Sequence, residues 1–182
     1  MPATDVVMAG FGGQGLMAIG KILAKAAMDE GLEVTWLPSY GPEMRGGTAN
    51  CVVVIDDEPI ASPIVRRARA AIVMNKQSID KFEPNLVPDG LLVVNSSLID
   101  RRATRDDIRA VYVPANEVAE REGSARAANM VMLGAYVAAT GIVSPGAVEH
   151  AIGKTFEEKP KAAESSVRAF RRGLEAAQAA AS

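Results

Sequence analysis

Apolar and polar residues follow one another along the first part of the chain in the order of a strand, a helix and a second strand. Residues 6–9 form a short apolar run that ends at Gly10, as in a strand buried on both faces of a sheet. Apolar residues then recur at helical spacing from Leu16 to Ala27, and Gly31 is placed to end the helix. A second strand is predicted over residues 33–37. This order is that of a βαβ unit, so we expect the two strands to form a parallel pair with a right-handed crossover.

The middle of the chain carries further apolar and β-branched runs, and its last third has the pattern of helices. Strands are predicted at residues 49–55, 70–74, 91–94 and 111–114, with a helix at residues 78–86. Asp56 and Asp57 indicate a hairpin turn that leads into a short returning segment at residues 58–60, and Asp89 with Gly90 indicates another turn. Helices are predicted at residues 117–122, 130–140, 145–152 and 162–179, with Ser144 as the N-cap before Pro145.

These elements predict a single domain that spans residues 1–182. The expected fold is α/β: a mostly parallel, Rossmann-like sheet with an added hairpin, flanking helices and a helical C-terminal part. The sequence contains no internal repeat and no low-complexity linker that would divide it.

The composition excludes several classes of protein. The net charge is −2 and aromatic residues make up 4 %, which does not suit a nucleic-acid-binding surface. Cys51 and His150 are the only residues of their kinds, so the chain cannot ligate an iron–sulfur cluster, build an ordinary zinc site or close an internal disulfide. No apolar run is long enough to span a bilayer and the first residues lack the pattern of a signal peptide, so we expect a cytoplasmic protein.

A glycine cluster follows the first strand, and Gly10, Gly12 and Gly15 fit the pattern G-x-G-x-x-G, with Gly13 and Gln14 between them. Such a turn can bring a dinucleotide phosphate close to the backbone at a helix N-terminus. Dinucleotide binding also needs an acid at the end of the second strand to hold the ribose, and residues 36–40 contain none. Two interpretations therefore stay open: a purely structural tight turn, or a turn that faces a partner subunit or a ligand phosphate.

A second unusual segment, residues 39–50, follows the second strand at its carboxyl end, where ligands sit in open α/β sheets. It should lie beside the glycine cluster, because both leave their strands at the same edge. Its candidate residues for an interface or for a loop facing an active site are Tyr40, Glu43, Met44, Arg45, Gly46, Gly47 and Asn50. Among the remaining polar groups, Arg66, Arg67 and Arg69 form a short basic patch, either a solvated face or a docking site for an acidic partner.

Three segments together resemble the gamma subunit of 2-oxoacid:ferredoxin oxidoreductases: residues 10–15, residues 39–51 and residues 133–141 with Leu133, Gly134, Thr140 and Gly141. The resemblance covers residues 5–174 and is greatest to the 2-oxoglutarate and branched-chain types. It implies that thiamine diphosphate, magnesium and iron–sulfur clusters are held by alpha and beta subunits, with a delta subunit in some enzymes. The complex decarboxylates a 2-oxoacid, passes electrons to ferredoxin and transfers the acyl group to coenzyme A.

The resemblance assigns this chain no catalytic residue, no cofactor site and no metal site of its own, and implies that it is inactive alone. The glycine cluster and residues 39–50 are then the expected contacts with partner subunits and with the route of coenzyme A. In isolation the subunit could form a homodimer through an apolar interface. The alternatives are a stand-alone NAD-dependent oxidoreductase and a module that binds coenzyme A or a nucleotide.

Overall fold

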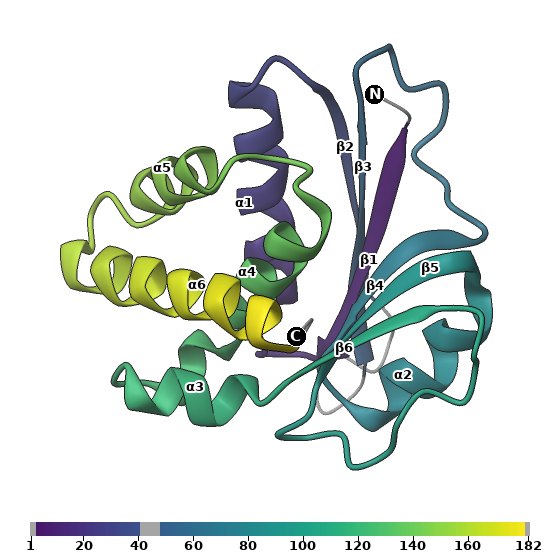
Figure 1. Cartoon of the computed structure of the whole chain (residues 1–182). Helices are drawn as coiled ribbons and strands as arrows, with labels where there is room; N and C mark the ends of the chain where they lie inside the picture. The colour runs from purple at the N-terminus through teal and green to yellow at the C-terminus, as the bar shows by residue number, and fades with distance from the viewer. Residues whose placement is uncertain (1–2, 41–47, 181–182) are drawn as a thin grey trace.

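A six-stranded sheet forms the centre of the computed structural model, which describes residues 3–40 and 48–180 (Figure 1). The strands lie side by side in the order β2-β3-β1-β4-β5-β6. Their bounds are β1 Thr4–Phe11, β2 Glu33–Tyr40, β3 Thr48–Asp56, β4 Ala68–Val73, β5 Leu86–Asn95 and β6 Arg109–Val113. Strands β1, β4, β5 and β6 are parallel, whereas β3 runs antiparallel to both of its neighbours.

Two details of the predicted topology are wrong. β1 and β2 do run in the same direction, but β3 lies between them, so they are not hydrogen-bonded neighbours. The added hairpin consists of β2 and β3, whereas residues 57–67 contain no strand after Asp56. The physical reason is the connection length: a parallel crossover needs a dozen or more residues, and only residues 41–47 separate β2 from β3.

Helices cover the two faces of the sheet unequally (Figure 1). One face carries α1, α3, α4, α5 and α6, and the other carries α2. Their bounds are α1 Leu16–Asp29, α2 Lys76–Phe82, α3 Ala115–Arg121, α4 Ala128–Thr140, α5 Pro145–Thr155 and α6 Pro160–Ala180, with 3-10 turns at Glu83–Asn85 and Ala125–Ala127. Ser144 caps α5 as predicted, because its hydroxyl accepts a hydrogen bond from the backbone N–H of Ala147 at 3.2 Å. The predicted fold class is confirmed.

Two apolar clusters, one on each face of the sheet, form the core. The larger cluster joins α1, α4, α5 and α6 to the sheet and includes Ile19, Leu133 and Phe170. The smaller cluster lies on the α2 face and includes Val7 and Ile79. Residues 6–10 of β1 are all buried, as expected of a strand in the middle of a sheet covered on both faces. Within the described part of the chain, no helix is long and apolar enough to cross a membrane.

Helices α4 and α6 cross in close contact at Gly134 and Gly173. A Cβ atom added at Gly134 would overlap the carbonyl oxygen of Phe170 and lie 2.9 Å from the backbone nitrogen of Leu174. One added at Gly173 would overlap the carbonyl oxygen of Val131. The two helices therefore pack backbone against backbone, which explains why Gly134 is found in the middle of an otherwise apolar helix.

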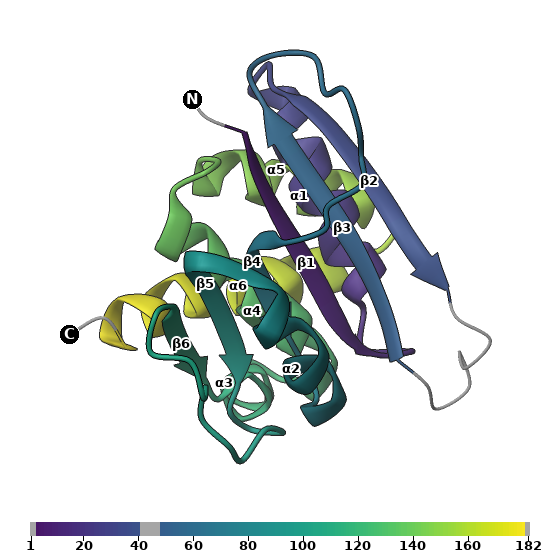
Figure 2. The same cartoon turned by 90° about the vertical axis from the view of Figure 1, so that its right-hand side faces the viewer.

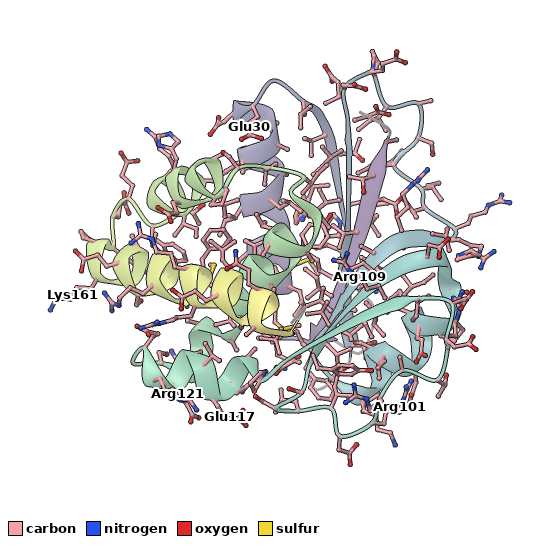
Figure 3. All side chains as sticks on the ribbon, in the orientation of Figure 1. Glu30, Arg101, Arg109, Glu117, Arg121 and Lys161 are labelled. Carbon is pink, nitrogen blue, oxygen red and sulfur yellow. The ribbon has the colours of Figure 1, made fainter. Side chains whose placement is uncertain are left out.

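A buried carboxylate fixes the segment that connects β5 to β6. Glu83 is 1 % exposed and accepts hydrogen bonds from Arg101 Nη1 at 2.8 Å, Arg105 N at 3.0 Å and Thr104 Oγ1 at 3.1 Å. Figure 3 shows Arg101 beside α2, on the side of the sheet away from α6. Burial acts to raise the pKa of Glu83, but these hydrogen bonds hold it below its ordinary value of 4.5. The carboxylate is therefore charged in the folded protein at neutral pH.

Candidate functional site

The carboxyl edge of the parallel strands brings together the segments singled out in the sequence. β1 leads through α1 towards one side of the sheet, and β4 leads through α2 towards the other, so the strand order reverses between β1 and β4. Ligands of open α/β sheets bind at such a switch point. Gly10 pairs with Ala49, which also pairs with Tyr40, and Phe11 pairs with Thr48. The glycine turn and the residues that flank residues 41–47 therefore share this edge, as predicted.

The predicted site residues divide into described and undescribed groups. Gly10, Gly12, Gly13, Gln14 and Gly15 form the end of β1 and the turn into α1, and Tyr40 is the last residue of β2. Asn50 lies in β3 between Ala9 and Ser39 and is half-buried. Glu43, Met44, Arg45, Gly46 and Gly47 lie outside the described residues, so their roles stay predictions.

Gln14 folds back over the glycine turn and satisfies its backbone. Its Oε1 accepts a hydrogen bond from Phe11 N at 2.6 Å, and its Nε2 lies 3.5 Å from the carbonyl oxygen of Met74, directly after β4. A Cβ atom at Gly10 would overlap this Gln14 oxygen and lie 2.9 Å from Met74 Cβ. Gly10 is thus required so that the Gln14 amide can close the turn against the neighbouring strand.

The third glycine of the motif has a similar internal role. Gly15 is the N-cap of α1 and has a φ of 77°, in the left-handed region that favours glycine. Its carbonyl oxygen accepts a hydrogen bond from Asn129 Nδ2 at 3.1 Å, and a Cβ atom at Gly15 would overlap this amide nitrogen. Asn129 belongs to the first turn of α4, so the glycine turn is held from a helix more than a hundred residues later in the chain.

These contacts do not favour the dinucleotide interpretation. In a dinucleotide site the glycines leave room for a phosphate, whereas here amides of Gln14 and Asn129 occupy the space beside Gly10 and Gly15. The strand next to β1 on the side of β2 is β3, so the end of β2 does not reach the position of a ribose-binding acid. The glycine cluster therefore behaves mainly as a tight turn.

A cavity of about 210 Å³ lies beside this turn. It is lined by the turn itself, through Gly13 and Gln14, and by Asn116, Arg126 and Asn129 from the segments around α3 and α4. Within residues 3–40 and 48–180, the exposed guanidinium of Arg126 has no hydrogen-bond or ion-pair partner. The cavity therefore presents amide groups and one unpaired cation, which suit an anionic group such as a phosphate.

Asn95, at the end of β5, holds one wall of this cavity in place through hydrogen bonds to Ala115 and Asn116. Its Nδ2 donates to Asn116 Oδ1 at 2.8 Å, and its Oδ1 accepts from Ala115 N at 3.2 Å. Asn116, Arg126 and Asn129 were not among the residues predicted from the sequence. One signal could have indicated Asn116, which follows a strand end at the same edge, whereas Arg126 and Asn129 have no such local signal.

The described residues offer little chemistry for catalysis. Cys51 is fully buried in β3, its thiol donates to the carbonyl oxygen of Leu16 at 3.4 Å, and burial raises its pKa to about 12. His150 is exposed on α5. Among residues 3–40 and 48–180, no three His, Cys, Asp or Glu side chains gather where they could hold a metal ion.

A family model and curated relatives both match this chain, and the relatives are subunits of 2-oxoacid oxidoreductases. Residues 5–176 match the model of the family described as pyruvate ferredoxin/flavodoxin oxidoreductase. The 2-oxoglutarate synthase subunit KorC of Methanothermobacter thermautotrophicus is 39 % identical over 178 residues, which cover 94 % of this chain and 93 % of KorC. The ketoisovalerate oxidoreductase subunit VorA of the same organism is 39 % identical over 176 residues, but this chain spans only 36 % of the length of VorA.

Solved structures agree with these relatives. The gamma subunit of a keto/oxoacid ferredoxin oxidoreductase from Geobacter sulfurreducens superposes with a TM-score of 0.87 at 32 % identity, and 99 % of each chain is covered. The 2-oxoglutarate:ferredoxin oxidoreductase from Magnetococcus marinus, solved with 2-oxoglutarate, coenzyme A and succinyl-CoA bound, shares the fold with a TM-score of 0.90. At 22 % identity, with 98 % of this chain matching 32 % of that chain, this second likeness concerns the fold alone.

Proposed function

The chain belongs to the pyruvate ferredoxin/flavodoxin oxidoreductase family, and we propose that it is the gamma subunit of a 2-oxoacid:ferredoxin oxidoreductase. The observation that carries this proposal is the end-to-end match to a free-standing gamma subunit. The reaction class is the oxidative decarboxylation of a 2-oxoacid to an acyl-coenzyme A. The partners are alpha and beta subunits, with a delta subunit where the enzyme has one, and ferredoxin reaches the complex through them.

In this assignment the partner subunits carry out the chemistry, and this chain binds them. Thiamine diphosphate with magnesium, held by the partner subunits, supplies the chemistry that releases carbon dioxide, and iron–sulfur clusters there receive the electrons. A single cysteine and a single histidine leave this chain without the ligands for a cluster. Its part is to bind the catalytic subunits and to shape the approach of coenzyme A. The relatives named for ketoisovalerate and 2-oxoglutarate are equally identical to it, so the proposal covers both substrate types.

The cavity beside the glycine turn is the place where we expect this chain to meet coenzyme A. Its volume is smaller than the roughly 300–1,000 Å³ of a site that encloses a whole small molecule, so it would hold one anionic group rather than the complete coenzyme. Arg126 would pair with that group, and the amides of Gln14 and Asn116 lie in the same wall. In the assembled enzyme, Arg126→Ala should raise the KM for coenzyme A several-fold and leave the KM for the 2-oxoacid unchanged.

The test of the subunit assignment is capture of the tagged chain from its native cells under low oxygen. The bound chains are identified by mass spectrometry, and the eluate is assayed for reduction of a viologen dye that requires both a 2-oxoacid and coenzyme A. Recovery of thiamine- and cluster-binding chains with this activity is the expected result. If the chain is recovered alone and no such activity accompanies it, the assignment fails.

A further inference from the structure

The face of the sheet that carries α2 is covered only in part. Figure 2 looks onto this face: α2 lies low on the sheet and residues 57–67 run across β3 and β1, while on this face no helix of the described chain covers β2 and β3. Two large apolar side chains are exposed here, Leu37 of β2 at 42 % and Ile64 of the crossing segment at 71 %. Leu37 pairs across the strands with Val52, which is half-buried on the same face.

A small apolar pit opens between β3, the crossing segment and α2. Its volume is about 80 Å³, and it is lined by two polar residues, Arg66 and Asn85, and by five apolar residues: Val7, Val52, Val65, Ala68 and Phe82. A pit of this size is far below the roughly 300–1,000 Å³ of a small-molecule site, so it does not suit a cofactor. It suits one apolar side chain of another protein, inserted in the way that anchor residues fill pockets at the centre of interfaces.

The rim of the pit carries a cation without a partner. Arg66 lines the pit, and its exposed guanidinium has no hydrogen-bond or ion-pair partner among residues 3–40 and 48–180. Its neighbours in the basic patch are engaged: Arg67 donates to the carbonyl oxygen of Leu86 at 3.0 Å, and Arg69 lies 3.8 Å from the carboxylate of Asp5. If the basic patch is a docking site for an acidic partner, Arg66 is therefore the member of the patch that remains available to bind it.

We propose that this pit and Arg66 are a docking site for a catalytic chain of the same oxidoreductase, which inserts one apolar side chain flanked by an acidic residue. The inference rests on the proposed function and deepens it by naming the surface and the chemistry of the partner. In VorA a segment similar to this chain is joined to a longer polypeptide, so this domain works beside further protein. The apolar pit and the cation on its rim select an apolar anchor and an acid from that protein.

Two surface substitutions test the proposal without disturbing the core. Ile64→Lys adds a charge where the side chain is already exposed, and Arg66→Glu reverses the unpaired charge on the rim. The matched controls are Met28→Lys, at a position 62 % exposed on α1, and Lys161→Glu at the start of α6. Figure 3 shows Lys161 at the far end of α6, away from the sheet. All four variants should melt within about 2 °C of wild type, because such surface changes alter stability by about 0.5 kcal/mol at most.

The measurement is capture of the catalytic chains by each tagged variant, together with the activity recovered. Ile64→Lys and Arg66→Glu should each recover at least about tenfold less of the catalytic chains, the loss typical of a hot-spot residue, while both controls recover them like wild type. Equal recovery by all variants would overturn the inference. So would a homodimer of the isolated chain that these two variants alone dissociate. If the wild-type chain itself captures no catalytic chain, the gamma-subunit assignment fails. If the wild-type chain and all four variants capture catalytic chains equally, only the docking site is wrong.

Discussion

Replacing Gly134 with alanine tests the contact that holds α4 against α6. The added Cβ atom would overlap the carbonyl oxygen of Phe170 and approach two further backbone atoms of α6, Leu174 N at 2.9 Å and Gly173 Cα at 3.0 Å. A backbone atom cannot rotate away as a side chain can, so the two helices must separate. Phe170 is fully buried at this crossing, and its packing would loosen as the helices move apart.

The size of the effect follows from two opposing terms. Overpacking a close contact costs about 1–3 kcal/mol, and a contact with backbone belongs at the upper end of that range. Alanine is a better helix former than glycine by about 1 kcal/mol, which offsets part of the cost. The net loss should be about 2 kcal/mol, which lowers the melting temperature of a domain of this size by about 4–8 °C.

Thermal unfolding followed by circular dichroism measures this loss directly. Gly153→Ala is the matched control: it makes the same substitution within α5, where nothing lies within 4 Å of the added atom, and should raise stability by up to about 1 kcal/mol. Gly173→Ala adds a Cβ atom at the same crossing from the side of α6. Because either substitution alone already separates the helices, the double variant should lose less free energy of unfolding than the sum of the two single losses. A Gly134→Ala protein that melts at or above the wild-type temperature would refute the backbone contact.

Three further predictions concern Glu83, Cys51 and the glycine turn. Glu83→Ala should lower the free energy of unfolding by on the order of 2 kcal/mol at pH 7, because it leaves backbone N–H groups of the β5–β6 connection without their acceptor. Since hydrogen bonding holds the folded-state pKa of Glu83 below 4.5, the difference from wild type in urea titrations should shrink as the pH falls below 4.5, and a constant difference down to pH 2 would contradict this. Cys51, whose pKa burial raises to about 12, should react with a thiol reagent at pH 8 only after unfolding; rapid labelling of the folded protein would show that it is accessible. Millimolar NAD should leave the melting temperature unchanged, because Gln14 already accepts the hydrogen bond of Phe11 N, and a rise of several degrees would restore the dinucleotide interpretation.

The periodicity of apolar residues located the elements but not their lateral order. Most strands and long helices lie within a few residues of their predicted positions, because burial selects the residues that form each element. The exception is β5, which begins at Leu86, five residues before its predicted start, and runs through Asp89 and Gly90, so the turn predicted there is wrong. The insertion of β3 between β1 and β2 could not be predicted in this way. A run such as Val52, Val53 and Val54 is compatible with any pair of neighbours, and only the short connection to β2 indicates an antiparallel direction.

The candidate site was predicted where local chemistry is visible and missed where the site depends on distant contacts. The glycine turn is a local motif, and its position at the carboxyl edge follows from the strand that precedes it. Its closure by Asn129, from a helix far along the chain, has no local signature. The same holds for Arg126, which looks like any exposed arginine until the fold places it in the wall of the cavity.

The most direct test of the central claim is removal and return of this chain in its own enzyme. Extracts of cells that lack the chain are assayed for viologen reduction that depends on coenzyme A, with 3-methyl-2-oxobutanoate, 2-oxoglutarate or pyruvate as the 2-oxoacid. If the chain is the gamma subunit, at least one of these activities is absent from the extract and returns, to saturation, as the purified wild-type chain is added. If all of the activities present in the parent cells persist without the chain, and its addition changes none of them, the assignment is contradicted.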